Sequence, residues 1–200
     1  MSANIAVIHY SATGNVHRLA TALAEGAADA GAEVRLRTVP ELAPEGAIAA
    51  NARWVAHREA VASVPHATLD DLEWADGFAL GSPTRFGLPS AQLKQFLDQT
   101  GPLWARGVLA SKVGTAFTSA STAHGGLEST VLAINNVLYH WGTLVMPLGY
   151  TDASIDVTGN PYGASWISRK GSGPDDEALA AARHQGRRLA TIAAALRTVR

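Results

Sequence analysis

The chain has 200 residues, of which 47% are hydrophobic and 16% charged, with a formal net charge of -1 at pH 7. This length and composition predict one globular domain over residues 1–200 with a substantial core. The near-neutral charge and the lack of a long basic run argue against a nucleic-acid partner. The absence of cysteine excludes disulfides, thiolate catalysis and thiolate metal sites. No apolar stretch approaches a membrane span and no charged leader is evident, so we expect no membrane insertion and a cytoplasmic location.

The chain opens with an apolar run, Ile5 to Tyr10, that is typical of a buried strand in a parallel sheet. A turn over 11–16 follows with two hydroxyls, a glycine and an amide, and leads into a helix that ends at Gly31. Because a helix N-terminus presents unpaired N–H groups, this turn predicts an anion site, with phosphate the favoured guest. The sequence contains neither GxGxxG after the strand nor GxxxxGK[ST], which disfavours a dinucleotide turn and a P-loop. The pattern suits a phosphomonoester held by the Ser11 and Thr13 hydroxyls; the alternative is an ordinary capped strand-to-helix turn.

The remaining pattern alternates strands with helices. We expect strands at 33–39, 77–81, 112–117 and 143–148, and helices at about 47–59, 89–101, 128–141 and 177–197. This order predicts an α/β doubly wound fold, a five-stranded parallel sheet of order 2-1-3-4-5 with helices on both faces. Residues 41–68 fit a surface excursion, in which we expect His57, Arg58 and His66 to be solvated.

Two further loops that follow strand ends contain residues suited to ligand binding. The loop Ser82–Gly87 offers a rigid backbone, the charge of Arg85 and the ring of Phe86, although burial of that ring against its own helix is the common alternative. Residues 118–126 contain hydroxyls and glycines but no bulky apolar side chain, so we expect them outside the core, presenting backbone groups to a polar, planar ligand. In a sheet of this order the loops after strands one, three and four meet at one crevice.

Two segments beyond these loops leave more than one interpretation. Trp104 lies among small residues and glycines and is either a core plug or an aromatic plate beside a ligand. The long segment 149–173 is irregular and rich in glycine, proline and aromatics, which favours a functional loop or an interface.

Several runs together resemble the flavodoxin-like, FMN-dependent NAD(P)H:quinone oxidoreductases of the WrbA type. They are Tyr10–Asn15, Gly81–Gly87, Phe96–Trp104, the Gly-Gly stretch with Glu128, and Pro161–Ala164. The resemblance covers nearly the whole chain. It implies a flavodoxin-like fold, FMN as cofactor, NADPH or NADH as reductant and a quinone as substrate.

The resemblance also assigns roles to particular residues. It implies that three groups bind FMN: Ser11, Ala12, Thr13, Gly14, Asn15 and Val16 at the phosphate, Pro83, Thr84, Arg85, Phe86 and Gly87 beside the isoalloxazine, and Ser119, Ala120, Ser121, Thr122, Ala123, His124, Gly125 and Gly126 at its polar edge. His140 occupies the family's flavin-contacting histidine position, reached from a neighbouring subunit, so we expect a homo-oligomer, a dimer or tetramer. Trp104, with Phe86, would border the substrate, which favours the plate over the plug.

Three departures from the family pattern leave the reductant preference and the quinone size open. Thr13 stands where many members have a tyrosine that meets the nicotinamide partner. The loop after the fourth strand is one residue longer than in the best-known members, and Trp141 replaces a second histidine. The His-Gly-Gly-Leu-Glu-Ser-Thr run is similar to members that act on benzoquinones.

The resemblance implies a two-electron, ping-pong reaction, in which NAD(P)H and then a quinone use one open flavin face, with His140 or solvent supplying a proton. The alternatives are a flavodoxin-like electron carrier and a flavin-binding regulatory or scaffold protein without quinone turnover. We expect no metal, because the seven histidines show no HExxH or paired spacing. No GxSxG elbow supports a serine hydrolase.

Overall fold

The computed structural model describes residues 2–197 and contains a parallel sheet with the path β2-β1-β3-β5-β6. These strands span β1 Asn4–His9, β2 Glu33–Thr38, β3 Gly77–Arg85, β5 Val113–Ala120 and β6 Leu144–Val145. The five expected strands correspond to this path in their expected order. The expectation is wrong in detail, because two short strands branch from it and bring the described sheet to seven. β4 (Leu88–Pro89) pairs antiparallel with β3, and β7 (Ser165–Ile167) pairs parallel with β5.

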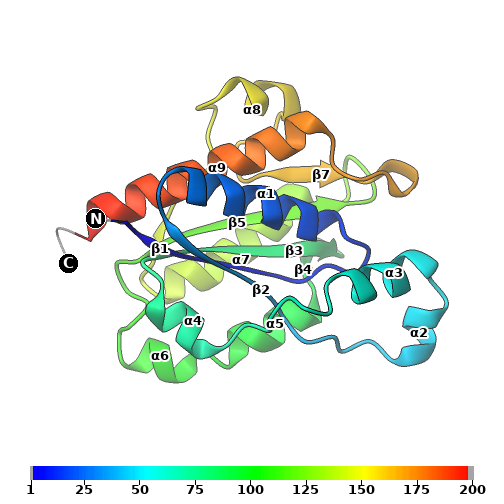
Figure 1. The fold of residues 1–200 in the computed structure, drawn as a ribbon, viewed down its shortest axis with the longest axis horizontal. Helices are drawn as coiled ribbons and strands as arrows, with labels where there is room; N and C mark the ends of the chain where they lie inside the picture. The colour runs from blue at the N-terminus through cyan, green and yellow to red at the C-terminus, as the bar shows by residue number, and fades with distance from the viewer. Residues whose placement is uncertain (1, 198–200) are drawn as a thin grey trace.

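Helices cover both faces of the sheet (Figure 1). One face carries α1 (Asn15–Asp29), α9 (Asp176–Leu196) and the short α8 (Ala153–Thr158). The other carries α4 (Leu69–Trp74), α5 (Ala91–Asp98), α6 (Gly101–Ala105) and α7 (Leu127–His140). Two further helices, α2 (Glu45–Ala49) and α3 (Ala52–Ala60), follow β2 and lie beyond the carboxyl ends of the strands. Among the described residues, no helix combines the length and apolar character that a bilayer crossing requires.

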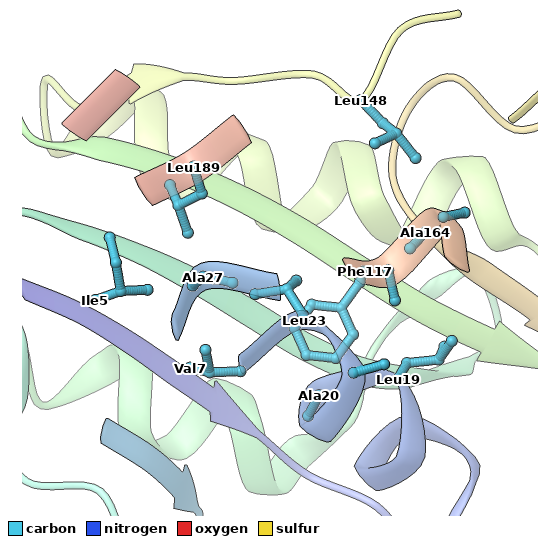
Figure 2. Packing of buried hydrophobic residues seen from close by; sticks show 14 of the residues in the cluster. Ile5, Val7, Leu19, Ala20, Leu23, Ala27, Phe117, Leu148, Ala164 and Leu189 are labelled. Atoms are coloured by element: carbon cyan, nitrogen blue, oxygen red, sulfur yellow. The ribbon is translucent and has the colours of Figure 1, made fainter. Parts of the chain in front are cut away.

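The core between the sheet and the α1–α9 layer is organised around Phe117. Figure 2 shows its ring from β5 next to Leu23 of α1, and Val7 of β1 and Leu189 of α9 belong to the same cluster. Gly81 on β3 makes room for this ring, because a Cβ there would lie 2.2 Å from Phe117 Cζ. The apolar side chains of β1 are fully buried, as expected for a central parallel strand.

The polar loops predicted after the third and fourth strands begin later than expected. β3 runs on to Arg85 and β5 to Ala120, and Pro83 pairs with Ser119 in the ladder. Thr118 is fully buried and its Oγ1 donates a 2.7 Å hydrogen bond to the carbonyl oxygen of Ser82. The expectation that residues 118–120 lie outside the core is therefore wrong: they belong to the β5 ladder, and the Ser82 carbonyl satisfies the buried Thr118 hydroxyl.

Several other segments differ from the pattern-based expectation. Residues 41–68 hold two helices instead of one, and residues 101–105 form α6, with Pro102 in its first turn, where a loop was expected. The fifth strand shortens to two residues, while 149–173 contains α8 and β7. These elements are too short for hydrophobic periodicity to reveal them.

Candidate functional site

The three predicted loops meet in one pocket of about 550 Å³ at the carboxyl edge of the sheet. Its lining includes eleven of the residues that the resemblance assigns to FMN: Ser11, Ala12, Thr13, Asn15, Val16, Pro83, Thr84, Arg85, Ser119, Ala120 and Ser121. The volume lies within the range of small-molecule sites. The convergence follows from the ladder, since β1 and β5 both pair with β3.

The turn after β1 leaves the N-terminus of α1 open to this pocket. Gly14 is the N-cap with φ +96°, and no side chain caps the helix. The backbone N–H of Gly14 donates to Ser11 Oγ at 3.1 Å, which folds the turn back on itself. Only glycine adopts this left-handed conformation without strain, and the first N–H groups of the helix are left for an outside acceptor. The turn is therefore built to receive an anion.

A tight hairpin between β3 and β4 forms the second wall. Phe86, at its tip, has φ +55° and a fully exposed side chain, which rules out burial against its own helix. Thr84 Oγ1 accepts hydrogen bonds from the Gly87 backbone N–H at 3.2 Å and from Thr130 Oγ1 at 2.8 Å. The first bond closes the hairpin, and the second links it to α7. Phe86 and Gly87 lie at the rim and not in the lining.

The turn between β5 and α7 completes the third side. Gly126 is the N-cap of α7 with φ +96°, and a Cβ there would lie 2.8 Å from the Cα of Gly87. The hairpin and this turn therefore touch through two glycines. Thr122, Ala123 and His124 are exposed, and the stretch 122–126 lies beyond the pocket lining.

Five further lining residues were not predicted: Asn51, Arg53, Trp54, Ser168 and Gly171. The first three belong to the start of α3, where Asn51 Oδ1 accepts hydrogen bonds from the backbone N–H groups of Arg53 and Trp54 at 3.1 and 3.4 Å. Asparagine is a favoured N-cap, so Asn51 was a usable signal for this helix. Ser168 and Gly171 belong to the segment 149–173, which was expected to be a functional loop or an interface. Its pattern does not indicate that 168–171 returns to this pocket, because that placement depends on β7 pairing with β5.

Trp104 and His140 do not join this pocket within the chain. They line a separate groove of about 370 Å³, and Trp104 Nε1 donates a 2.9 Å hydrogen bond to the His140 backbone carbonyl. Trp104 is 57% exposed, so it is not a core plug. His140 ends α7, whereas the pocket lies beside the N-terminal end of that helix.

Three histidines cluster behind the turn that follows β1, and one expectation about them is wrong. His57 is half-buried, not solvated; it packs over Gly14, where a Cβ would lie 3.5 Å from His57 Nδ1. His17 Nδ1 and His9 Nε2 are 2.9 Å apart, and the His17 and His57 ring centroids are 5.4 Å apart. Arg58 and His66 are exposed, as expected.

Burial and mutual repulsion keep these imidazoles neutral. Burial, together with the charges that His17 and His57 would carry, lowers the pKa of His9 to about 3. Burial and His17 likewise lower the pKa of His57 to about 4, against a bond to the Ser11 backbone that acts to raise it. Within the described chain, no group of three or more histidines or carboxylates has the arrangement of a metal site.

The residues of the pocket fit the phosphate and polar edges of FMN. The lining contains six hydroxyl side chains, two amide side chains, two arginines and no carboxylate. Hydroxyls, guanidinium groups and free backbone N–H groups donate hydrogen bonds to phosphate oxygens, and a carboxylate would repel them. Together with the left-handed glycine cap of α1, this donor set suits an anionic mononucleotide.

Comparison with known proteins gives a consistent result. Residues 3–155 match the family model described as NADPH-dependent FMN reductase. Two full-length relatives carry the name NAD(P)H dehydrogenase (quinone). The protein from Geobacter sulfurreducens is 45% identical, with 96% of this chain and 98% of the relative covered, and that from Syntrophus aciditrophicus is 44% identical with the same coverage.

Solved structures support the same fold. A flavodoxin, WrbA-like protein from Agrobacterium tumefaciens has a TM-score of 0.70 at 25% identity, covering 97% of this chain and 99% of that one. A flavodoxin from the domain Archaea has a TM-score of 0.64 at 19% identity, covering 96% and 99%. The second likeness concerns the fold alone.

Proposed function

The chain belongs to the family of NADPH-dependent FMN reductases, and from this membership we propose that it is an FMN-dependent NAD(P)H:quinone oxidoreductase. The relatives named NAD(P)H dehydrogenase (quinone) match it over nearly their whole length, which supports quinone reduction. The two-electron, ping-pong route is the one that the resemblance implies. Benzoquinones are the substrate class that we would test first.

One observation carries the proposal: three turns that are far apart in sequence line a single pocket that contains no carboxylate and opens on the N-terminus of α1. A phosphate at that helix end would meet backbone N–H groups and the Ser11 and Thr13 hydroxyls. An electron carrier needs only part of its flavin exposed, whereas a quinone reductase must also admit a second planar molecule. The exposed ring of Phe86 at the rim supports the quinone reductase, because an aromatic ring can border a second planar molecule.

The residues of the pocket would bind FMN and orient its reaction partners, and the cofactor would supply the redox chemistry. Bound FMN would supply the hydride chemistry that links NAD(P)H oxidation to quinone reduction. Ser11–Val16 hold the phosphate, while Thr84 and Arg85 border the ring system. The resemblance assigns the backbone groups of 119–126 to its polar edge; of these, 119–121 line the pocket and would lie where hydrogen bonds stabilise negative charge. Orientation of the two planar partners over one open face is the chain's main contribution.

We propose that Trp104 and His140 complete the site of a neighbouring copy in a homo-oligomer. They share one groove through the bond between Trp104 Nε1 and the His140 carbonyl, and neither reaches the pocket of its own chain. The exposed Trp104 would then border the quinone, and His140 would contact the flavin. His140 is also a candidate to protonate the quinol oxygen.

A steady-state assay tests the proposed function. Purified protein loaded with FMN is mixed with NADPH or NADH and a benzoquinone, and reductant oxidation is followed. We expect turnover with FMN bound and none after FMN is removed. Loaded protein that fails to oxidise either reductant with any benzoquinone would defeat the proposal and leave the electron-carrier or scaffold alternative.

A further inference from the structure

We propose that Arg53 is a further ligand for the FMN phosphate and that Gly171 gives its guanidinium the room to reach it. The inference rests on the proposed function, since it takes the phosphate to lie at the N-terminus of α1. Arg53 lies outside the three turns to which the resemblance assigns the cofactor, and it lines the same pocket.

Arg53 lines the pocket onto which the N-terminus of α1 opens. Its Nη1 donates a 2.8 Å hydrogen bond to the Gly171 carbonyl, and a Cβ on Gly171 would lie 1.4 Å from that nitrogen. Two residues further along, a Cβ on Gly173 would lie 1.9 Å from Nη1 of Arg18, which belongs to the first turn of α1. The segment 171–173 therefore contacts arginine side chains from both the start of α3 and the first turn of α1. Figure 1 shows α3 and the loop after β7 at the same end of the sheet.

The charge of Arg53 is not matched by a carboxylate. Within residues 2–197 it forms no ion pair, whereas Arg58 on the same helix pairs with Glu45 at 2.7 Å. The bond to Gly171 uses one of its five N–H donors, which leaves several for an anion. Because no carboxylate lines the pocket, an anionic ligand is the available partner.

The start of α3 is held firmly enough to position this charge. Glu41 accepts hydrogen bonds from Trp54 Nε1 at 3.0 Å and from the Tyr10 hydroxyl at 2.8 Å. Asn51 caps the helix and bonds the backbone N–H of Arg53 itself. Residue 53 is thereby fixed relative to the end of β1, so less conformational freedom is lost when its guanidinium binds. The second lining arginine, Arg85, lies on the β3–β4 hairpin, on the side assigned to the flavin ring.

The test compares FMN with riboflavin, which lacks the phosphate. Each flavin is titrated into the full-length protein stripped of cofactor, and binding is read from quenching of flavin fluorescence. Arg53→Gln should weaken FMN by about tenfold or more and leave riboflavin unchanged, because a charge-assisted hydrogen bond to the phosphate is lost. Arg53→Lys should recover part of the loss, and Gly171→Ala, which displaces the guanidinium, should resemble Arg53→Gln. Arg58→Gln on the same helix is the matched control and should bind both flavins like the parent.

The outcomes separate this inference from the proposed function. If the parent protein binds FMN and reduces quinones but Arg53→Gln keeps the same preference for FMN over riboflavin, the inference is wrong and the function stands. Equal weakening of both flavins would assign Arg53 a structural role and also overturn it. If the parent itself does not prefer FMN to riboflavin, no phosphate contact exists at Arg53. If Arg53→Gln weakens FMN binding and leaves riboflavin binding unchanged, but the parent protein does not reduce quinones, the inference is supported and the proposed function is rejected. Thermal unfolding of each variant checks that it folds.

Discussion

The histidine cluster behind the turn after β1 makes the fold sensitive to acid. The pKa values of His9, His17 and His57 all lie below the ordinary value of 6.5, chiefly because burial disfavours the charged ring. The charges that face the cluster are these imidazoles themselves. The unfolded chain therefore binds more protons than the folded chain from about pH 6.5 downward.

We predict that the free energy of unfolding is fully developed above pH 6.5 and falls as pH drops toward 4. Each histidine contributes a slope of at most about 1.4 kcal/mol per pH unit within its own window. Denaturant unfolding at pH 7.5, 6 and 5 measures this slope. His57→Gln should flatten the dependence, whereas His66→Gln, at an exposed position, should not. Equal stability of the parent protein at pH 7.5 and 5 would show that the cluster is not held neutral.

Phe86 and Arg53 illustrate how far the positions of single residues could be predicted from the sequence. Phe86 was expected at an exposed loop tip, and the structure gives it a fully exposed ring on a strained backbone. The sequence could not reveal Arg53 in the same way, because its position depends on a loop from the opposite end of the chain. Local patterns identify residues next to a strand end, but they carry no information about what folds back over it.

At the scale of elements, the layer of α1 and α9 depends on two glycines at the point where these helices meet. A Cβ on Gly186 would lie 1.9 Å from the Leu23 carbonyl oxygen, and one on Gly26 would lie 2.0 Å from that of Arg183. The two backbones are in contact there, and a methyl group has no space.

We predict that Gly186→Ala lowers the free energy of unfolding by about 1–3 kcal/mol, because the helices must separate. Gly46→Ala, inside α2 with open space around it, is the control and should change stability by less than about 1 kcal/mol. Denaturant unfolding of both variants measures these changes in the free energy of unfolding. A Gly186→Ala protein as stable as the parent would mean that the two helices do not approach so closely.

The elements themselves were predictable where they are long and periodic. The first strand, the first helix and the last helix begin and end within a residue or two of their expected limits. The misses are short elements set by tertiary contacts: α6 follows α5 after a two-residue break, and β7 exists because β5 extends to meet it. Because β3 and β5 extend further than expected, the lining residues Pro83–Arg85 and Ser119–Ala120 belong to strands instead of loops, and 122–126 lies beyond the lining.

At the scale of the whole molecule, the separation of Trp104 and His140 from the pocket predicts an assembly of more than one copy. If they complete a neighbouring site, Trp104→Ala should lower kcat/KM for the quinone by about tenfold, because the aromatic wall is lost, and leave the FMN affinity unchanged. Light scattering should give a mass of two or four copies. A monomer that is fully active would contradict this arrangement.

We propose that the pocket at the N-terminus of α1 holds FMN for two-electron transfer to quinones. An anaerobic titration of the FMN-loaded protein with NADPH, followed by benzoquinone, is the decisive experiment. We predict that one equivalent of NADPH bleaches the visible flavin absorption in a single two-electron step and that one equivalent of quinone restores it. Protein that takes up no FMN, or whose flavin reduces in two separate one-electron steps and is not reoxidised by the quinone, would contradict the account.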